Sequence, residues 1–269
     1  MPSGATTPTE SDVGARLDDV WRDEWGRLLA LLVARFGRLD LAEDALSEAF
    51  AAAVVHWPTD GVPDNPAGWL LTAARRRALD RIRAEGTAQR ALPALAVEAD
   101  LREEVERTMA DAGETVNDER LRLVLLCAHP SLDPESAAAL TLRLVLGIAT
   151  EDVARLFLVP TPTMAARLTR SRKKLAGASF AVPSGPELVS RVAVVADVAY
   201  LAFTAGYAPG SGADVVRAEV AGEAIRLVRV LRSLLPLSFS GGAELDALLA
   251  LMLIQHSRRD ARVADDRLV

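Results

Sequence analysis

The sequence predicts an all-α protein with two small helical domains, an acidic linker between them and a helical C-terminal extension. Three observations predict this fold class. Apolar residues recur at three- and four-residue intervals, alternating strand patterns are scarce, and Gly- or Pro-containing breaks separate the periodic segments. Of the 269 residues, 50% are hydrophobic and 25% are charged, as in ordinary globular domains. This composition excludes a chain that is disordered throughout.

Changes in composition divide the chain into parts. All four tryptophans lie in the first quarter of the sequence, which indicates a module distinct from the rest. Acidic residues concentrate between two basic segments, where no sustained apolar stripe exists, so we expect a linker there. The expected parts are a disordered N-terminus at 1–17, domains at 18–86 and 118–177, the linker at 87–117 and the extension at 178–269. We expect the extension to be incomplete, because its final residues carry no helix-terminating cap.

Capping and breaking signals set the predicted helix limits along the chain. Asp40 with Glu43 gives a capping-box pattern, and Asn65 before a proline gives a cap with proline at the first helical position. Similar cap signals recur at Asp133, Thr150 and Thr161. The predicted helices span 21–36, 40–57, 66–85, 118–128, 134–146, 151–158, 162–175, 186–205, 213–235 and 244–257.

The composition also excludes several kinds of protein. A single cysteine, Cys127, rules out an internal disulfide framework and a zinc site built from several cysteines. His56, His129 and His256 fall in separate modules, and no pattern indicates a catalytic centre, a metal or a cofactor. No apolar run reaches the ~18 residues of a membrane span, and the N-terminus lacks the features of a signal peptide. We expect a cytoplasmic protein that is not an enzyme and does not contact a membrane.

The strongest functional signal lies at 147–175, where a short helix, a tight turn and a second helix have the proportions of a helix-turn-helix. The second helix has a polar, cationic stripe beside an apolar one. The cationic stripe is Thr163, Arg167, Arg170 and Lys174, and the apolar stripe is Met164, Leu168 and Leu175. Such a helix can dock through its apolar stripe and contact DNA with the other. A solvated helix end in an ordinary bundle is the alternative.

A second basic segment lies at 75–83, where five arginines are opposed by a single aspartate. The arginines fall on two neighbouring helix faces, Arg76 with Arg83 and Arg77 with Arg81. A basic face beside Trp69 suits melted or single-stranded nucleic acid, in which phosphates need cations and bases need flat partners. The alternative for Trp69 is a place in the domain core.

These segments, taken in order, resemble the extracytoplasmic-function sigma factors of bacterial RNA polymerase, over residues 18–177. DLAEDALSEAF at 40–50 is similar to region 2.2, which docks on the β′ clamp. NPAGWLLTAARRRALDRIRAE at 65–85 is similar to regions 2.3 and 2.4, which melt and read the −10 element. The helix-turn-helix at 147–176 is similar to region 4.2, whose second helix enters the major groove of the −35 element.

The resemblance implies three sets of contact residues, with promoter DNA and core RNA polymerase (β′ clamp and β flap) as partners. The −10 set is Asp64, Asn65, Trp69, Arg75, Arg76, Arg77, Arg81 and Arg83. The −35 set is Thr161, Thr163, Arg167, Arg170, Arg172, Lys173 and Lys174. The polymerase set is Asp40, Glu43, Asp44 and Glu48, for which a solvated or metal-binding acidic cluster is the alternative reading.

The stretches at 187–208 and 223–236 are similar to the tetratricopeptide-like extension of one sigma subgroup. That resemblance implies regulation of the sigma core in cis by the extension, and a separate anti-sigma factor is the alternative regulator. The competing hypothesis is a one-component repressor, with DNA binding at 118–177 and an effector or dimerisation domain at 186–269. Residues 18–85 discriminate between the two, because a repressor needs no second, arginine-rich module.

Overall fold

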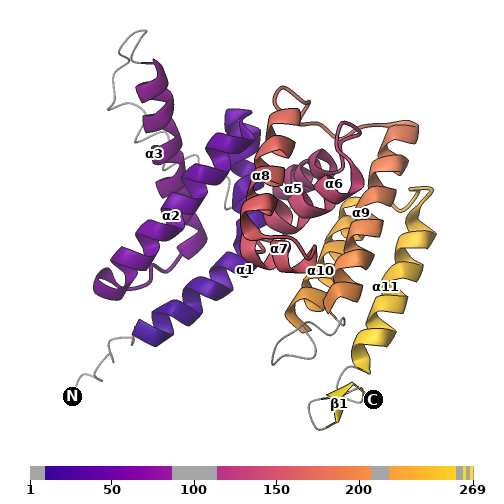
Figure 1. Cartoon of the computed structure of the whole chain (residues 1–269). Coiled ribbons are helices and arrows are strands. Elements are labelled where there is room, and N and C mark those ends of the chain that lie inside the picture. Colours follow the sequence, from indigo (N-terminus) through magenta and orange to yellow (C-terminus); the bar gives the residue numbers. More distant parts are fainter. Residues whose placement is uncertain (1–9, 87–113, 207–217, 259–262, 265–266, 269) are drawn as a thin grey trace. The chain divides into compact units, whose positions relative to one another are not determined.

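The computed structural model describes residues 10–86, 114–206, 218–258, 263–264 and 267–268, and these ranges are helical almost throughout (Figure 1). Within them the β-structure consists of two short antiparallel strands, β1 (Val263–Ala264) and β2 (Arg267–Leu268). The all-α prediction is therefore confirmed. The chain divides into two compact units, Met1–Arg120 and Leu121–Val269. None of the described helices combines the length and the apolar character needed to cross a lipid bilayer.

Three mutually packed helices build the first unit, and they are α1 (Glu10–Phe36), α2 (Leu39–Asp60) and α3 (Pro66–Gly86). Their predicted apolar stripes face inward, where Leu41 and Ala45 of α2 pack with Ala78 of α3 in one buried cluster. Full burial of a large aliphatic side chain contributes about 1.5–3 kcal/mol. This packing holds α3 against α2 and thereby determines which of their polar side chains meet.

Helix α1 begins earlier than the sequence indicated. Disorder was expected at 1–17, but the helix starts at Glu10, and the expectation is wrong from there onward. The reason is that Val13 and Leu17 lie one helical turn apart and are both buried, so they extend the apolar stripe of α1. Residues 1–9 lie outside the described residues.

One of the two predicted caps in this unit is confirmed. Asn65 Oδ1 accepts a hydrogen bond of 2.9 Å from the backbone N–H of Gly68, which caps α3 as predicted. The predicted capping box of α2 is wrong, because the N-cap residue is Arg38 and no side chain caps it. Asp40 instead accepts a hydrogen bond of 3.2 Å from Arg38 Nη2, and Glu43 is buried.

The helix-turn-helix lies in the second unit. Helix α5 (Glu114–Cys127) crosses the boundary at residue 120 into this unit, and it is followed by α6 (Pro134–Leu140) and the π-helical turn η1 (Thr141–Val145). Helices α7 (Thr150–Leu156) and α8 (Thr161–Lys174) form the helix-turn-helix itself. Asp133 caps α6 as predicted, because its Oδ1 accepts a hydrogen bond of 2.8 Å from Ser136 N. The helix expected at 134–146 is present, but its second half is wound as η1. Most of the expected acidic linker, at 87–113, lies outside the described residues.

The extension consists of α9 (Gly185–Gly206), α10 (Ala218–Leu234) and α11 (Gly242–Ser257), close to the predicted limits. Helix α9 packs on α10 and α11 and also on α6 and η1. Arg191 is buried in this contact, and its Nη1 donates a hydrogen bond of 3.2 Å to the backbone carbonyl of Leu125 in α5. Its Nη2 bonds Glu187 Oε1. The first helix of the extension is thus tied to the backbone of the domain before it.

Candidate nucleic-acid interface

Helix α8 is mounted by the apolar stripe that the sequence predicted. Met164, Leu168 and Leu175 are all buried, and α8 packs against α6 and α7. The sequence produces this arrangement because the three residues recur at helical spacing on one face. The opposite face of α8 is therefore left to solvent and can meet a ligand.

The predicted −35 residues divide between an exposed and a half-buried group. Thr161, Thr163, Arg170, Lys173 and Lys174 are exposed, whereas Arg167 and Arg172 are half-buried. Arg167 bends toward the protein, where its Nη1 lies 2.9 Å from Glu135 Oε2 and its Cζ lies 5.8 Å from the centre of the Phe157 ring. Lys174 Nζ lies 3.8 Å from Asp133 Oδ2.

Arg170 and Lys173 are thus the cations of α8 best placed to meet a polyanion. Both are exposed, and neither forms an ion pair with any residue that the structure describes. Two exposed threonines precede them at the start of the helix, Thr161 and Thr163. Hydroxyl, guanidinium and ammonium groups all bond phosphates and base edges, so this face can bind duplex DNA.

The turn between α7 and α8 contains a feature that the sequence reasoning missed. Leu158 has a φ of 54° and is 92% exposed. It lies between two backbone hydrogen bonds that end α7, from Val159 N to Ala154 O at 3.0 Å and from Leu158 N to Arg155 O at 3.2 Å. This is the Schellman pattern, in which glycine usually occupies the left-handed position. Helical periodicity carries no signal for it.

The five arginines of α3 point in different directions. Arg76 and Arg83 are exposed, and Arg83 forms an ion pair of 3.1 Å with Asp80 one turn earlier. Arg75 is buried, with 3% of its surface exposed, so it cannot meet a ligand in this conformation. The remaining two, Arg77 and Arg81, turn toward α2.

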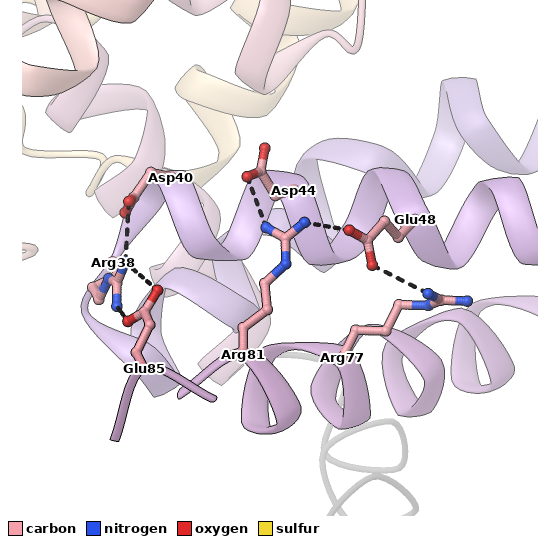
Figure 2. A network of polar contacts seen from close by, with 7 residues as sticks. All are labelled: Arg38, Asp40, Asp44, Glu48, Arg77, Arg81 and Glu85. Atoms are coloured by element: carbon pink, nitrogen blue, oxygen red, sulfur yellow. Dashed lines mark hydrogen bonds and ion pairs between the residues drawn. The ribbon is translucent and has the colours of Figure 1, made fainter. Parts of the chain in front are cut away.

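Arg77 and Arg81 belong to a network of ion pairs between α2 and α3, which we call the interhelical network (Figure 2). Its members are Arg38, Asp40, Asp44, Glu48, Arg77, Arg81 and Glu85. Arg81 Nη1 donates to Asp44 Oδ2 at 2.8 Å, and its Nη2 bonds Glu48 Oε1. Arg77 Nη1 bonds the other oxygen of Glu48 at 3.1 Å. At the far end, Arg38 bridges Asp40 and Glu85.

The interhelical network joins two sets of residues that the sequence assigned to different partners. Asp44 and Glu48 were expected to contact polymerase, and Arg77 and Arg81 were expected to contact DNA. Each of these arginines has its charge balanced within the unit, and the hydrogen bond to Asp44 raises the pKa of Arg81. Glu43, also in the expected polymerase set, is buried. In this conformation the cations of α3 that face outward are Arg76 and Arg83.

The loop before α3 combines exposed polar groups with a half-buried aromatic ring. Asp64 is exposed, and Asn65 is exposed while it caps α3. The Trp69 ring packs edge-on against the Trp57 ring, with 5.6 Å between the ring centres. Because Trp57 is buried and Trp69 is half-buried, Trp69 supports the core and still presents part of its surface to solvent.

Three protein-family models match this chain in succession. Sigma-70 region 2 matches residues 22–87, and sigma-70, region 4 matches residues 122–175. A family of unknown function, DUF6596, matches residues 191–269. The first match spans α2 and α3, the second includes α7 and α8, and the third lies in the extension.

A curated protein of Rhizobium meliloti (strain 1021), named as uncharacterized, is 37% identical to this chain over 238 residues. The alignment covers 87% of this chain and 55% of that protein, so the chain spans about half the length of this relative. No solved structure matches the chain significantly.

Proposed function

This chain belongs to the sigma-70 family as an extracytoplasmic-function-like sigma factor, and from that premise we propose that it directs core RNA polymerase to promoters with a −10 and a −35 element. The observation that carries the proposal is the order of the two matched regions together with an exposed cationic face on α8. A sigma factor acts by binding, so the proposal needs no catalytic residue in the chain.

The −35 element is the proposed ligand of α8. Arg170 and Lys173 would contact phosphates or guanine edges, and Thr161 and Thr163 would meet the groove near the start of the helix. Arg167 contributes less than its place in the sequence suggests, because Glu135 already pairs with it. The buried stripe of α8 has no direct part in DNA contact.

The −10 element is the proposed ligand of α3 and of the loop before it. Arg76 and Arg83 provide exposed positive charge, and Trp69 with Asp64 offers a flat surface and a polar group to a displaced base. Arg77 and Arg81 act by holding α3 against α2, so their role toward DNA is one of positioning. Unstacking a base costs a few kcal/mol, which the second DNA contact on the same polymerase helps to offset.

Polymerase is the proposed partner of the outer face of α2. Asp40 and Asp44 are exposed and Glu48 is half-buried, so all three can still approach a basic partner while they hold arginines of this unit. We leave buried Glu43 out of this contact. The extension would act in cis on the helix-turn-helix domain that precedes it in the same unit, and the buried contact of Arg191 with the Leu125 carbonyl supports such coupling.

Transcription in vitro tests the proposal directly. The full chain is added to core RNA polymerase that lacks a sigma subunit, with a pool of genomic fragments as template, and the start sites are mapped. We expect initiation at a common pair of elements. The double variant Arg170→Glu with Lys173→Glu should abolish this initiation and leave polymerase binding intact, because the buried stripe of α8 is unchanged. Arg229→Glu, at an exposed cation of α10, is the matched control and should have no effect.

Co-purification with core polymerase tests the second partner. Asp44→Lys should weaken it, whereas Asp60→Lys at the exposed end of α2 should not. A chain that fails to bind polymerase and instead binds palindromic duplex DNA as a dimer would be a repressor, and the proposal would be wrong.

A further inference from the structure

The turn between α7 and α8 contains a residue that is unfavourable for the isolated chain. Leu158 is the non-glycine residue with positive φ among those that the structure describes. It occupies the left-handed position of the Schellman pattern that ends α7, where glycine is preferred because a Cβ atom crowds the backbone. Strained backbone positions of this kind cluster at active sites and ligand-binding sites.

Packing within the chain does not supply that reason. The Leu158 side chain is 92% exposed, so it buries almost no apolar surface. Leu237, in the loop between α10 and α11, is 91% exposed but has no positive φ. Leu158 therefore combines an unfavourable backbone conformation with an uncovered apolar side chain, which a contact with another molecule would cover.

The position of Leu158 indicates what that molecule is. It precedes the first residue of α8 by three positions, and in a helix-turn-helix the start of the second helix lies nearest to the base edges. Its exposed neighbours in sequence are Pro160, Thr161, Pro162 and Thr163, and it is the one exposed large hydrophobic side chain of the helix-turn-helix at 147–175. A broad apolar protein surface would find no patch here. The C5-methyl group of thymine is a small apolar target in the major groove that suits a single leucine.

We propose that Leu158 is a specificity-determining residue that packs on a thymine methyl group at the −35 element. The inference rests on the proposed function and adds to it a contact outside the cationic stripe. A contact of this kind favours thymine over other bases without a hydrogen bond, because the methyl group is removed from water against the leucine side chain.

The test uses the full chain with core polymerase on a promoter found by the start-site mapping described above. Each thymine of the −35 element is replaced in turn by deoxyuridine, which removes only the methyl group. We expect one replacement to lower initiation by the unmodified chain about fourfold, the equivalent of ~0.8 kcal/mol for one buried methyl group. Leu158→Gly should initiate at this lower level on both templates.

Two controls separate this contact from a structural effect. Leu237→Gly should keep the full preference for thymine, since it removes an equally exposed leucine elsewhere. Leu158→Gly should be at least as resistant to urea as the unmodified chain, because glycine adopts positive φ without strain. Resistance is measured by labelling of Cys127, which is buried in the second unit.

The possible outcomes distinguish the inference from the proposed function. If no deoxyuridine replacement changes initiation by the unmodified chain, the inference alone is overturned. The same holds if the Leu158→Gly variant keeps the preference for thymine. Equal loss on thymine and deoxyuridine templates also overturns it and indicates a protein partner. Absence of initiation by the unmodified chain refutes the proposed function itself.

Discussion

The contact between Asp44 and Arg81 can be measured, and its strength decides whether Arg81 is held by α2 or is available to DNA. The perturbation is a double-mutant cycle with Asp44→Asn, Arg81→Met and the combined variant. Arg81 Nη1 lies 2.8 Å from Asp44 Oδ2, and the two side chains are 38% and 63% exposed. Removing Arg81 also removes a hydrogen bond to Glu48, so the cycle is needed to isolate one pair.

The expected coupling free energy between Asp44 and Arg81 follows from how exposed their side chains are to solvent. Measured exposed ion pairs contribute about 0.2–1 kcal/mol, and both groups here are more than a third exposed, so solvent screens them. We expect a coupling free energy of about 0.5 kcal/mol at low ionic strength. At ~0.5 M salt the Debye length falls to about 4 Å, and the coupling should fall by about half. Arg81→Met alone should cost about 1 kcal/mol, because it breaks two contacts.

Urea unfolding followed by tryptophan fluorescence is the assay. All four tryptophans lie in the first 69 residues, so the signal reports the first unit and not the second. The control cycle combines Asp44→Asn with Arg83→Met, and it should give no coupling because Arg83 pairs with Asp80. A coupling of zero between Asp44 and Arg81 at low salt, or one that salt leaves unchanged, would refute the reasoning and return Arg81 to the DNA-contacting set.

Three further predictions concern the second unit. Asp133→Ala should lower its stability by about 1 kcal/mol through loss of the α6 cap. Hydrogen bonds from Ser136 hold the pKa of Asp133 below its usual value. The contribution of Asp133 to the stability of the second unit is therefore present above about pH 4 and is lost as the pH falls further. Labelling of Cys127 in urea measures this loss. Leu168→Ala should lower the free energy of unfolding of the second unit by about 2–5 kcal/mol, because Leu168 is 1% exposed and its truncation leaves a cavity. Labelling of Cys127 detects this loss, and the tryptophan transition should stay unchanged because all four tryptophans lie in the first unit. Arg170→Ala should reduce the salt dependence of promoter binding by about one counterion, and an equal reduction by Arg167→Ala would contradict the pairing of Arg167 with Glu135.

Local signals predicted the helices well because they act within a few residues. The cap at Asn65 and the buried stripe through Met164 and Leu168 depend on spacing along one helix, and both are present. The early start of α1 was missed because Val13 and Leu17 were not read as part of its apolar stripe. Their burial depends on tertiary packing, which a search for caps does not detect.

The roles of individual charged residues were harder to predict. Arg81 and Glu48 are separated by 33 positions in sequence, so their meeting depends on how α3 lies against α2. A helical wheel can assign Arg77 and Arg81 to one face, but it cannot tell whether that face meets solvent or a row of carboxylates. The same limit applies to Leu158, whose backbone conformation is set by the end of α7 and not by apolar periodicity.

The hydrogen bond from Arg191 to the Leu125 carbonyl affects how the extension can be studied by deletion. Cutting the chain after Gly177 would take away the donor of that buried carbonyl and uncover the surfaces of α6 and η1 on which α9 packs. A shortened protein that loses activity would then have lost part of the support of its DNA-binding domain together with any regulator. Point substitutions on the solvent face of α9 that retain Arg191 would separate these two effects.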